Sequence, residues 1–407
     1  PYVFSVGSKI VIVLLGFLFS IVQSRYLGAA LKGDIAYISS VTSITCIVFG
    51  FGIHQAYPYY KKKFDSDIRP FFLRIALGEL VVYCTIALGI VVLWHPDTKF
   101  VAILFITPLS VYNRIVSYLT MVETPNEKNA TEMFVNFAEL ILVVGLWLSA
   151  SASFFIALLL VIFKDAMLSA AYSYKWRRLF FKQCDLKIDF IFKLLKFGFF
   201  PMLALLMSTL NYRVDVIMLN SLSTNVAVGV YSVGVSIAER VWLIPDALKD
   251  VMVSKLSKGK DSNEVTYVIR ICNTACLFVV LGIIILGKPF VNVLFGPEYA
   301  GAYDVIVVMI LGVFAMIYYK MIASYNIVNG KQIVNFVLLG LSTLTNIIGN
   351  LILIPKLGLM GAAWASVISY SVCAGLFVGY FCLKTGVKIQ NMCFITKHDF
   401  KKLKGAL

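Results

Sequence analysis

Residues 211–250 read NYRVDVIMLNSLSTNVAVGVYSVGVSIAERVWLIPDALKD. This stretch places Arg213, Asp215, Glu239 and Arg240 inside two segments that are otherwise apolar enough to lie in a membrane. A charge near the centre of a bilayer costs from about 3 to above ~10 kcal/mol, so it must face a partner, a protein interior or water. Such charges indicate a functional site, and the alternative is structural ion pairing between neighbouring helices.

The spacing of the first two charges argues against a pair on one helix. Arg213 and Asp215 are two residues apart in the sequence, which is about 200° around a helix axis. They therefore point to nearly opposite faces, and each needs its own surroundings.

The composition is that of an integral membrane protein. Hydrophobic residues make up 60% of the 407 residues and charged residues only 14%, compared with about 25% charged residues in soluble domains. Apolar runs longer than about 18 residues recur, which predicts helices and excludes an outer-membrane barrel, whose strands alternate over about 10 residues. The eight cysteines form neither a disulfide framework nor a metal-site spacing, so no metal site is expected.

Windows of about 20 residues predict twelve transmembrane helices. The fifth and sixth are separated only by a small polar turn at residues 149–153. The first run is interpreted as a retained span rather than a cleaved signal, and because the chain begins at Pro1, we expect a few residues to precede it. The predicted spans are 3–24, 34–57, 71–94, 100–121, 133–150, 153–173, 198–220, 226–248, 267–287, 303–325, 332–354 and 360–383.

We expect an all-α integral membrane fold of two six-helix bundles. Weak internal similarity at offsets of 196 and 199 residues indicates a duplication. Because each half has six spans, the second half would have the same orientation in the membrane as the first. The two halves would then be parallel repeats around a central cavity. The predicted parts are an N-terminal bundle (1–173), an amphipathic cytoplasmic linker (174–197), a C-terminal bundle (198–384) and a basic cytoplasmic tail (385–407).

Lysine and arginine determine the predicted orientation. The even-numbered connections and the tail hold 25 of these residues and the odd-numbered connections hold five. This bias places both termini in the cytoplasm, and it accounts for the net charge of +15 without nucleic acid as a partner. The remaining basic residues lie inside spans: Lys9, Arg114, Lys164, Arg213, Arg240 and Lys320.

Six short motifs lie in order along the chain: Ser24-Arg25-Tyr26-Leu27-Gly28, Arg213 with Asp215, residues 228–232 (VGVYS), Glu239-Arg240 with Ile244-Pro245, residues 295–299 (FGPEY) and residues 354–363 (IPKLGLMGAA). In these motifs and its twelve spans, the chain resembles the Wzx-type polysaccharide flippases of the multidrug/oligosaccharidyl-lipid/polysaccharide (MOP) exporter superfamily. The resemblance implies two bundles that open alternately to either side of the bacterial inner membrane. The implied substrate is an undecaprenyl-pyrophosphate-linked oligosaccharide repeat unit of O-antigen or capsule, and candidate protein partners are a polysaccharide polymerase and the chain-length machinery.

Two alternatives of other kinds stay open. A cation-coupled drug exporter of the MATE type shares the superfamily and the twelve spans, whereas lipid II flippases typically add two spans. A membrane enzyme acting on lipid-linked sugars is the third reading, but the three histidines, His54, His95 and His398, are scattered, and no Walker motif is present. We therefore expect no enzymatic activity and no cofactor, with H⁺ or Na⁺ coupling as the open possibility.

The intramembrane cations are the predicted binding residues. Arginine suits a phosphate because its planar fork donates two hydrogen bonds and keeps its charge. Arg240 and Arg213, at different depths, are the first candidates for holding the pyrophosphate. Arg114 is expected about as deep as Arg240, Lys9 nearer the cytoplasmic edge and Arg25 at the outer mouth.

The remaining intramembrane charges have other expected roles. Asp215 and Glu239 are candidates for ion coupling, Asp215 first, and packing against an arginine is the alternative. Lys164 is expected to pair with a neighbouring helix or with Asp165, and Lys320 to extend to the cytoplasmic interface. Pro245 is expected to bend or to end its helix.

The predicted orientation can be tested with reporter fusions. The fusion points are residues 62, 180 and 257 for the cytoplasm, and residues 97, 222 and 300 for the opposite side. The positive-inside bias predicts that the reporters alternate in this order. A phosphatase reporter active at any of the first three points would contradict the twelve-span topology.

Overall fold

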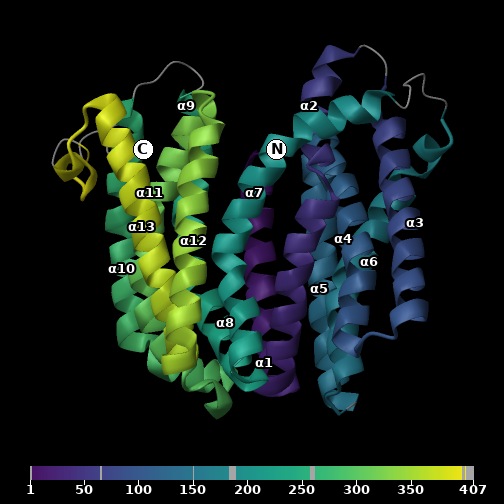
Figure 1. The fold of residues 1–407 in the computed structure, drawn as a ribbon, viewed down its shortest axis with the longest axis horizontal. Coiled ribbons are helices and arrows are strands. Elements are labelled where there is room, and N and C mark those ends of the chain that lie inside the picture. Colours follow the sequence, from purple (N-terminus) through teal and green to yellow (C-terminus); the bar gives the residue numbers. More distant parts are fainter. Residues whose placement is uncertain are drawn as a thin grey trace. The chain divides into compact units, whose positions relative to one another are not determined.

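The computed structural model describes residues 2–64, 67–149, 151–182, 189–256, 262–396 and 399. Regular structure in these ranges is helical (Figure 1). The elements are α1 (Tyr2–Phe49), α2 (Ile53–Lys63), α3 (Arg69–Trp94), α4 (Thr98–Glu123), α5 (Pro125–Ser149), α6 (Phe154–Phe180), α7 (Asp189–Leu222), α8 (Asn225–Glu239), η1 (Arg240–Trp242), α9 (Leu243–Leu256), α10 (Ser262–Phe295), η2 (Pro297–Tyr299), α11 (Ala302–Val328), α12 (Gln332–Leu357), α13 (Leu359–Thr385) and η3 (Ile389–Met392).

Eleven candidate spans lie in the described ranges, so the chain is a multi-pass integral membrane protein. Helix starts follow local capping chemistry, because Asp97, Ser153 and Thr224 each accept a hydrogen bond from the first turn of α4, α6 and α8. The turn predicted between the fifth and sixth spans is confirmed, since α5 ends at Ser149 and α6 begins at Phe154.

The first candidate span explains why the structure has eleven spans where twelve were predicted. It runs over Gly7–Phe49, 43 residues, and would be about 65 Å long if straight, roughly twice the ~30 Å hydrocarbon core. Gly28 breaks it, with φ 71° and ψ 171°, into two limbs (Figure 1). The predicted spans 3–24 and 34–57 therefore belong to one element, and the second ends earlier than predicted, at Phe49.

The chain divides into two compact units, Pro1–Leu206 (unit 1) and Met207–Leu407 (unit 2). The division falls inside α7. The predicted linker, 174–197, covers the end of α6 and the start of α7, and its residues 183–188 lie outside the described residues.

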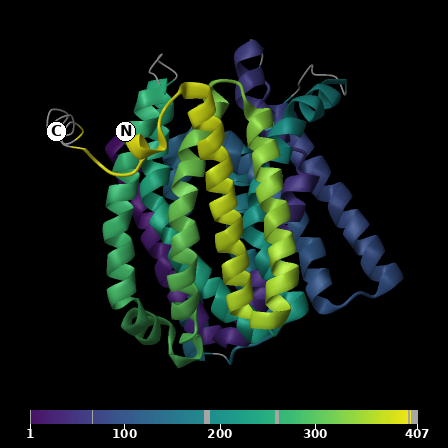
Figure 2. The same cartoon turned by 60° about the vertical axis from the view of Figure 1, so that its left-hand side comes forward.

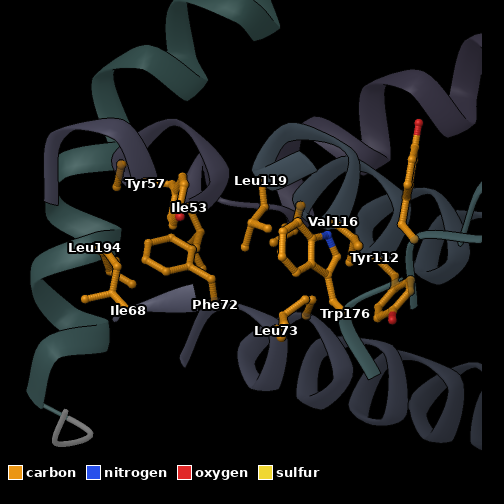
Figure 3. Packing of buried hydrophobic residues seen from close by; sticks show 14 of the residues in the cluster. Ile53, Tyr57, Ile68, Phe72, Leu73, Tyr112, Val116, Leu119, Trp176 and Leu194 are labelled. Carbon is orange, nitrogen blue, oxygen red and sulfur yellow. The ribbon is translucent and has the colours of Figure 1, made fainter. Parts of the chain in front are cut away.

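An apolar cluster holds α2 and α7 at one end of unit 1 (Figure 3). Tyr57 and Phe72 pack edge to face, with ring centroids 5.1 Å apart, and Leu194 of α7 is fully buried in the same cluster. The backbones of α2 and α7 also touch, because a Cβ on Gly52 would lie 2.4 Å from the carbonyl oxygen of Gly198. This close approach leaves no room for a side chain on Gly52.

Unit 2 is built around α11, the most buried of its candidate spans. It packs against α8, α9, α10 and α13. Figure 2 shows α12 and α13 side by side after a tight connection at Gly358. The apolar core of this unit therefore surrounds α11.

The described part of the predicted tail folds back onto α10. Arg270 donates to both carboxylate oxygens of Asp399, at 2.6 and 2.7 Å, and to the carbonyl oxygen of Asn391. Burial acts to raise the pKa of Asp399, but the bonds from Arg270 and Thr396 prevail and lower it to about 2. The other residues of the tail beyond Thr396 lie outside the described residues.

Replacing Gly28 tests the break in α1. The conformation at φ 71° and ψ 171° is accessible essentially only to glycine, so we expect Gly28→Ala to destabilise the folded protein by about 1–3 kcal/mol. Gly16→Ala is the matched control, because a Cβ at Gly16 meets nothing within 4 Å. Thermal challenge followed by fluorescence-detected size exclusion measures the difference, and equal stability of the two variants would contradict the break.

Candidate functional site

A polar cavity of about 490 Å³ lies within unit 1. Side chains from α1, α2, α4, α5, α6 and α7 line it. Its polar lining residues are Thr42, Ser43, His54, Ser110, Asn113, Arg114, Ser117, Tyr118, Lys128 and Asp165. Hydroxyl, amide and charged groups of this kind can replace the hydration shell of a polar solute inside a membrane protein.

The wall contributed by α4 is polar because of its residue spacing. Ser110, Asn113, Arg114 and Ser117 recur at three and four residues, which places them on one helix face. Ser110 donates to Asp165 at 2.5 Å, and the Asn113 side-chain nitrogen donates to the other carboxylate oxygen at 2.9 Å. Neutral donors thus occupy the carboxylate of Asp165.

Arg114 is the charged group that this arrangement leaves available. It is partly buried, and no carboxylate lies within 4.0 Å of its guanidinium among the described residues. The predicted pairing of Lys164 is found with α5 instead of Asp165, because its ammonium donates to Asn136 at 2.8 Å and lies 3.9 Å from Glu139. The guanidinium of Arg114 can therefore accept an anion in the cavity.

His54 is a lining residue that sequence reasoning missed. Only 7% of it is exposed, its ring lies edge-on to Tyr118 with centroids 5.2 Å apart, and its Nδ1 has no hydrogen-bond partner among the described groups. Burial, and then the charge of Arg114, lower the pKa of His54 to about 3. A neutral imidazole therefore faces the cavity, and no spacing in the sequence relates it to α4.

Two predicted cations of unit 1 lie elsewhere. Lys9 and Arg25 are exposed positions of α1, and neither belongs to the described lining of the cavity. The structure therefore does not gather them around Arg114.

The second group of predicted residues lies in unit 2, where α8 gives way to η1. A guanidinium nitrogen of Arg213 on α7 lies 4.0 Å from a carboxylate oxygen of Glu239, and their side chains are 39% and 18% exposed. Glu239 ends α8 and Arg240 begins η1. Arg213 and Glu239 thus approach each other beside a change of helix type, and Arg240 follows Glu239 in the chain.

The 3₁₀ turn has an identifiable cause. Pro245 has no N–H to donate to Val241, four residues earlier, and Cys276 approaches that carbonyl oxygen at 3.8 Å instead. Pro245 thus lies in the first turn of α9 and does not end the chain's helical path. Short 3₁₀ segments within long helices often mark hinges.

Asp215 is completely buried, and, as the spacing predicted, its described partners do not include Arg213. One carboxylate oxygen accepts hydrogen bonds from Tyr231 and from Ser366, the latter at 3.0 Å. The other accepts from the backbone N–H of Val216 at 2.8 Å. Asp215 therefore joins α7 to α8 and α13.

A buried polar seam continues from Asp215 through unit 2. Ser369 donates to Asn211 at 2.8 Å and shares a 3.0 Å contact with Ser342. Asn350 donates to Asn346 at 2.8 Å. Sequence reasoning missed this seam, although Ser342, Asn346 and Asn350 recur every four residues on α12.

Aromatic rings surround the start of α9. Tyr212 and Trp242 have ring centroids 5.1 Å apart, and Trp242 donates its indole N–H to Val313 at 2.9 Å. Lys320 lies over the Trp242 ring at 4.6 Å and donates to Asp246 at 3.0 Å. Lys320 thus forms a specific ion pair with Asp246, and its extension to the interface stays a prediction.

Comparison with known proteins adds the family and the fold. Residues 3–241 match the family described as "Polysaccharide biosynthesis protein". No protein with a curated description matches the chain. Solved structures with the same fold do match, at sequence identities that show the fold alone.

Three of these structures illustrate the likeness. The lipid II flippase MurJ, in an inward closed conformation, has a TM-score of 0.73 and 17% identity and covers 96% of this chain and 89% of that chain. An inward-facing MATE family transporter of the MOP superfamily has a TM-score of 0.64 and 14% identity, with coverage of 91% and 94%. A MOP superfamily transporter from Pyrococcus furiosus has a TM-score of 0.65 and 13% identity, with coverage of 94% for both. The expected all-α membrane fold of the MOP type is confirmed, with eleven candidate spans in the described residues instead of twelve.

A charge-removal series tests the contact between Arg213 and Glu239. Arg213→Ala leaves Glu239 without its cation, so we expect a loss of about 1 kcal/mol in stability, modest because Arg213 is partly exposed. Adding Glu239→Gln should restore the melting temperature, while Lys288→Ala, at an exposed position of α10, should leave it unchanged. A double variant as unstable as Arg213→Ala would argue against the ion pair.

Proposed function

Because the chain belongs to the polysaccharide biosynthesis protein family, we propose that it is a flippase for lipid-linked oligosaccharide repeat units of O-antigen or capsule type. Its family and its MOP fold are those of membrane transporters, not enzymes. The proposed substrate is an undecaprenyl-pyrophosphate-linked oligosaccharide, and the proposed route crosses the bacterial inner membrane by alternating access.

The observation that carries this proposal is the cavity of unit 1. A head group made of sugars and pyrophosphate needs hydroxyl and amide partners and a cation while it is inside the membrane. The lining of the cavity supplies serines, Asn113 and Arg114. Its acid, Asp165, is bonded to Ser110 and Asn113 and not to Arg114.

The cations of unit 2 extend the proposed binding set. Arg213 and Arg240 lie near the junction of α8 and η1, with Tyr212 and Trp242 available for stacking on sugar rings. Arg25 and Lys9, on α1, are proposed as contacts outside the cavity. In this scheme, the pyrophosphate exchanges one cation for another as it moves.

Glu239 is the acid better suited to ion coupling. One of its carboxylate oxygens has no hydrogen-bond partner among the described groups, and its side chain is 18% exposed. The carboxylate of Asp215, by contrast, is bonded on both oxygens and is completely buried. We therefore propose that H⁺ or Na⁺ would compete with Arg213 for Glu239, with Asp215 in a structural role.

Removing Arg114 tests the binding role of the cavity. A hydrogen bond to a charged group is worth about 1.5 to 3 kcal/mol, so we expect Arg114→Ala to lower export roughly tenfold or more. Arg114→Lys keeps the charge without the fork and should retain partial export. The experiment measures the amount of polysaccharide on the cell surface and the amount of the protein in the membrane. The cells carry the variant as their only copy of the protein.

Two comparisons make this result specific. Lys62→Ala removes an exposed cation of α2 outside the cavity and should export normally. Arg240→Ala and Arg240→Lys apply the same change in unit 2. Normal export by Arg114→Ala at normal abundance would contradict the binding role of the cavity. Altered drug susceptibility with an unchanged amount of surface polysaccharide would favour the drug exporter.

A further inference from the structure

A second cavity of unit 1, about 540 Å³, opens between α3, α4 and α6 and is lined almost entirely by apolar surface. Leu77, Leu80 and Leu109 form its walls, and it shares no lining residue with the cavity that holds Arg114. Leu77 is 43% exposed and Phe181 at the rim is 89% exposed. The groove therefore lies open on the outer surface of α3 and α6.

Two arginines lie at one end of this groove. Arg74 is in the second turn of α3 and Arg177 in the last turn of α6, and both line the groove and are exposed. Leu80 is six residues from Arg74, and Ser169 eight residues from Arg177. The apolar part thus extends about 9–12 Å beyond the level of the guanidiniums.

These arginines differ from the basic residues around them. Four described acids at this end of unit 1 are paired with cations: Glu123 with Lys61, Asp67 with Arg69 and Lys182, Glu132 with Lys128, and Glu127 with Lys175. Arg74 contacts only the carbonyl oxygens of Phe180 and Lys182 in the described structure, and Arg177 contacts the carbonyl oxygen and ring of Tyr174. Among the described residues, no carboxylate forms an ion pair with either of these two guanidiniums at the mouth of the groove.

We propose that this groove binds an anionic phospholipid of the bilayer. The phosphate would lie between Arg74 and Arg177, each of which can donate two hydrogen bonds, and an acyl chain would cover the leucines of α3 and α4. The predicted orientation places this end at the cytoplasmic face, where the lipids are anionic. The open side of the groove favours a resident lipid over the transported head group, which needs the polar cavity.

The test uses the purified full chain in detergent and measures retained lipid by native mass spectrometry. Wild-type protein should retain phosphatidylglycerol in preference to phosphatidylcholine. The double variant Arg74→Gln, Arg177→Gln should bind phosphatidylglycerol roughly 30-fold more weakly. Each arginine near an anionic surface contributes about fivefold in affinity, and the two contributions multiply. The matched control is Arg178→Gln, an exposed arginine one residue beyond Arg177 that does not line the groove, and it should bind normally.

The double variant could fail to fold, because Arg74 also bonds to the end of α6. A second variant therefore tests the groove with both arginines in place. Ala170→Trp fills the groove without changing charge, and it should lose phosphatidylglycerol while both arginines remain. Equal retention of the two lipids, or normal retention in Ala170→Trp, would overturn the proposal. If undecaprenyl phosphate displaces phosphatidylglycerol from the wild-type protein, and the same variants no longer bind undecaprenyl phosphate, the groove would instead be assigned to the lipid tail of the substrate.

Discussion

The hydrocarbon core of a bilayer cannot solvate a charge, and this constraint explains how the charged side chains of both units are arranged. In unit 2, Asp215 is completely buried and takes hydrogen bonds from Tyr231, Ser366 and the backbone of Val216. In unit 1, Asp165 receives Ser110 and Asn113. These two acids are thus bound by neutral donors rather than by cations.

Whether a cation is paired separates structural from functional candidates in this chain. Lys320 and Lys164 hold neighbouring helices together through Asp246, Asn136 and Glu139. Arg114 faces a polar cavity instead. Arg213 is intermediate, since its contact with Glu239 is long and partly exposed. A count of intramembrane charges alone would treat all of these residues as equivalent.

The helices could be predicted closely because they depend on hydropathy, which is local. The spans 71–94 and 332–354, for example, differ from α3 and α12 by at most three residues at either end. The break at Gly28 lies in the connection predicted between the first two spans, but the helix that continues on both sides of it was not predicted. The site could be predicted only in part: a charge inside a span stands out, as at Arg114 and Glu239, whereas His54 and the α12 seam depend on which helix faces meet.

The surroundings of Trp242 make the chain optically informative without any label. Its indole N–H is fixed to Val313, an ammonium group lies over its ring, and only 6% of it is exposed. Three of the five tryptophans, Trp94, Trp147 and Trp364, are exposed on the surface, and Trp176 lies in the apolar cluster of unit 1. Because indole emission responds to nearby charge and to polarity, rearrangement of the 3₁₀ turn would alter the intrinsic fluorescence of unit 2, so the chain carries its own spectroscopic probe next to Arg240.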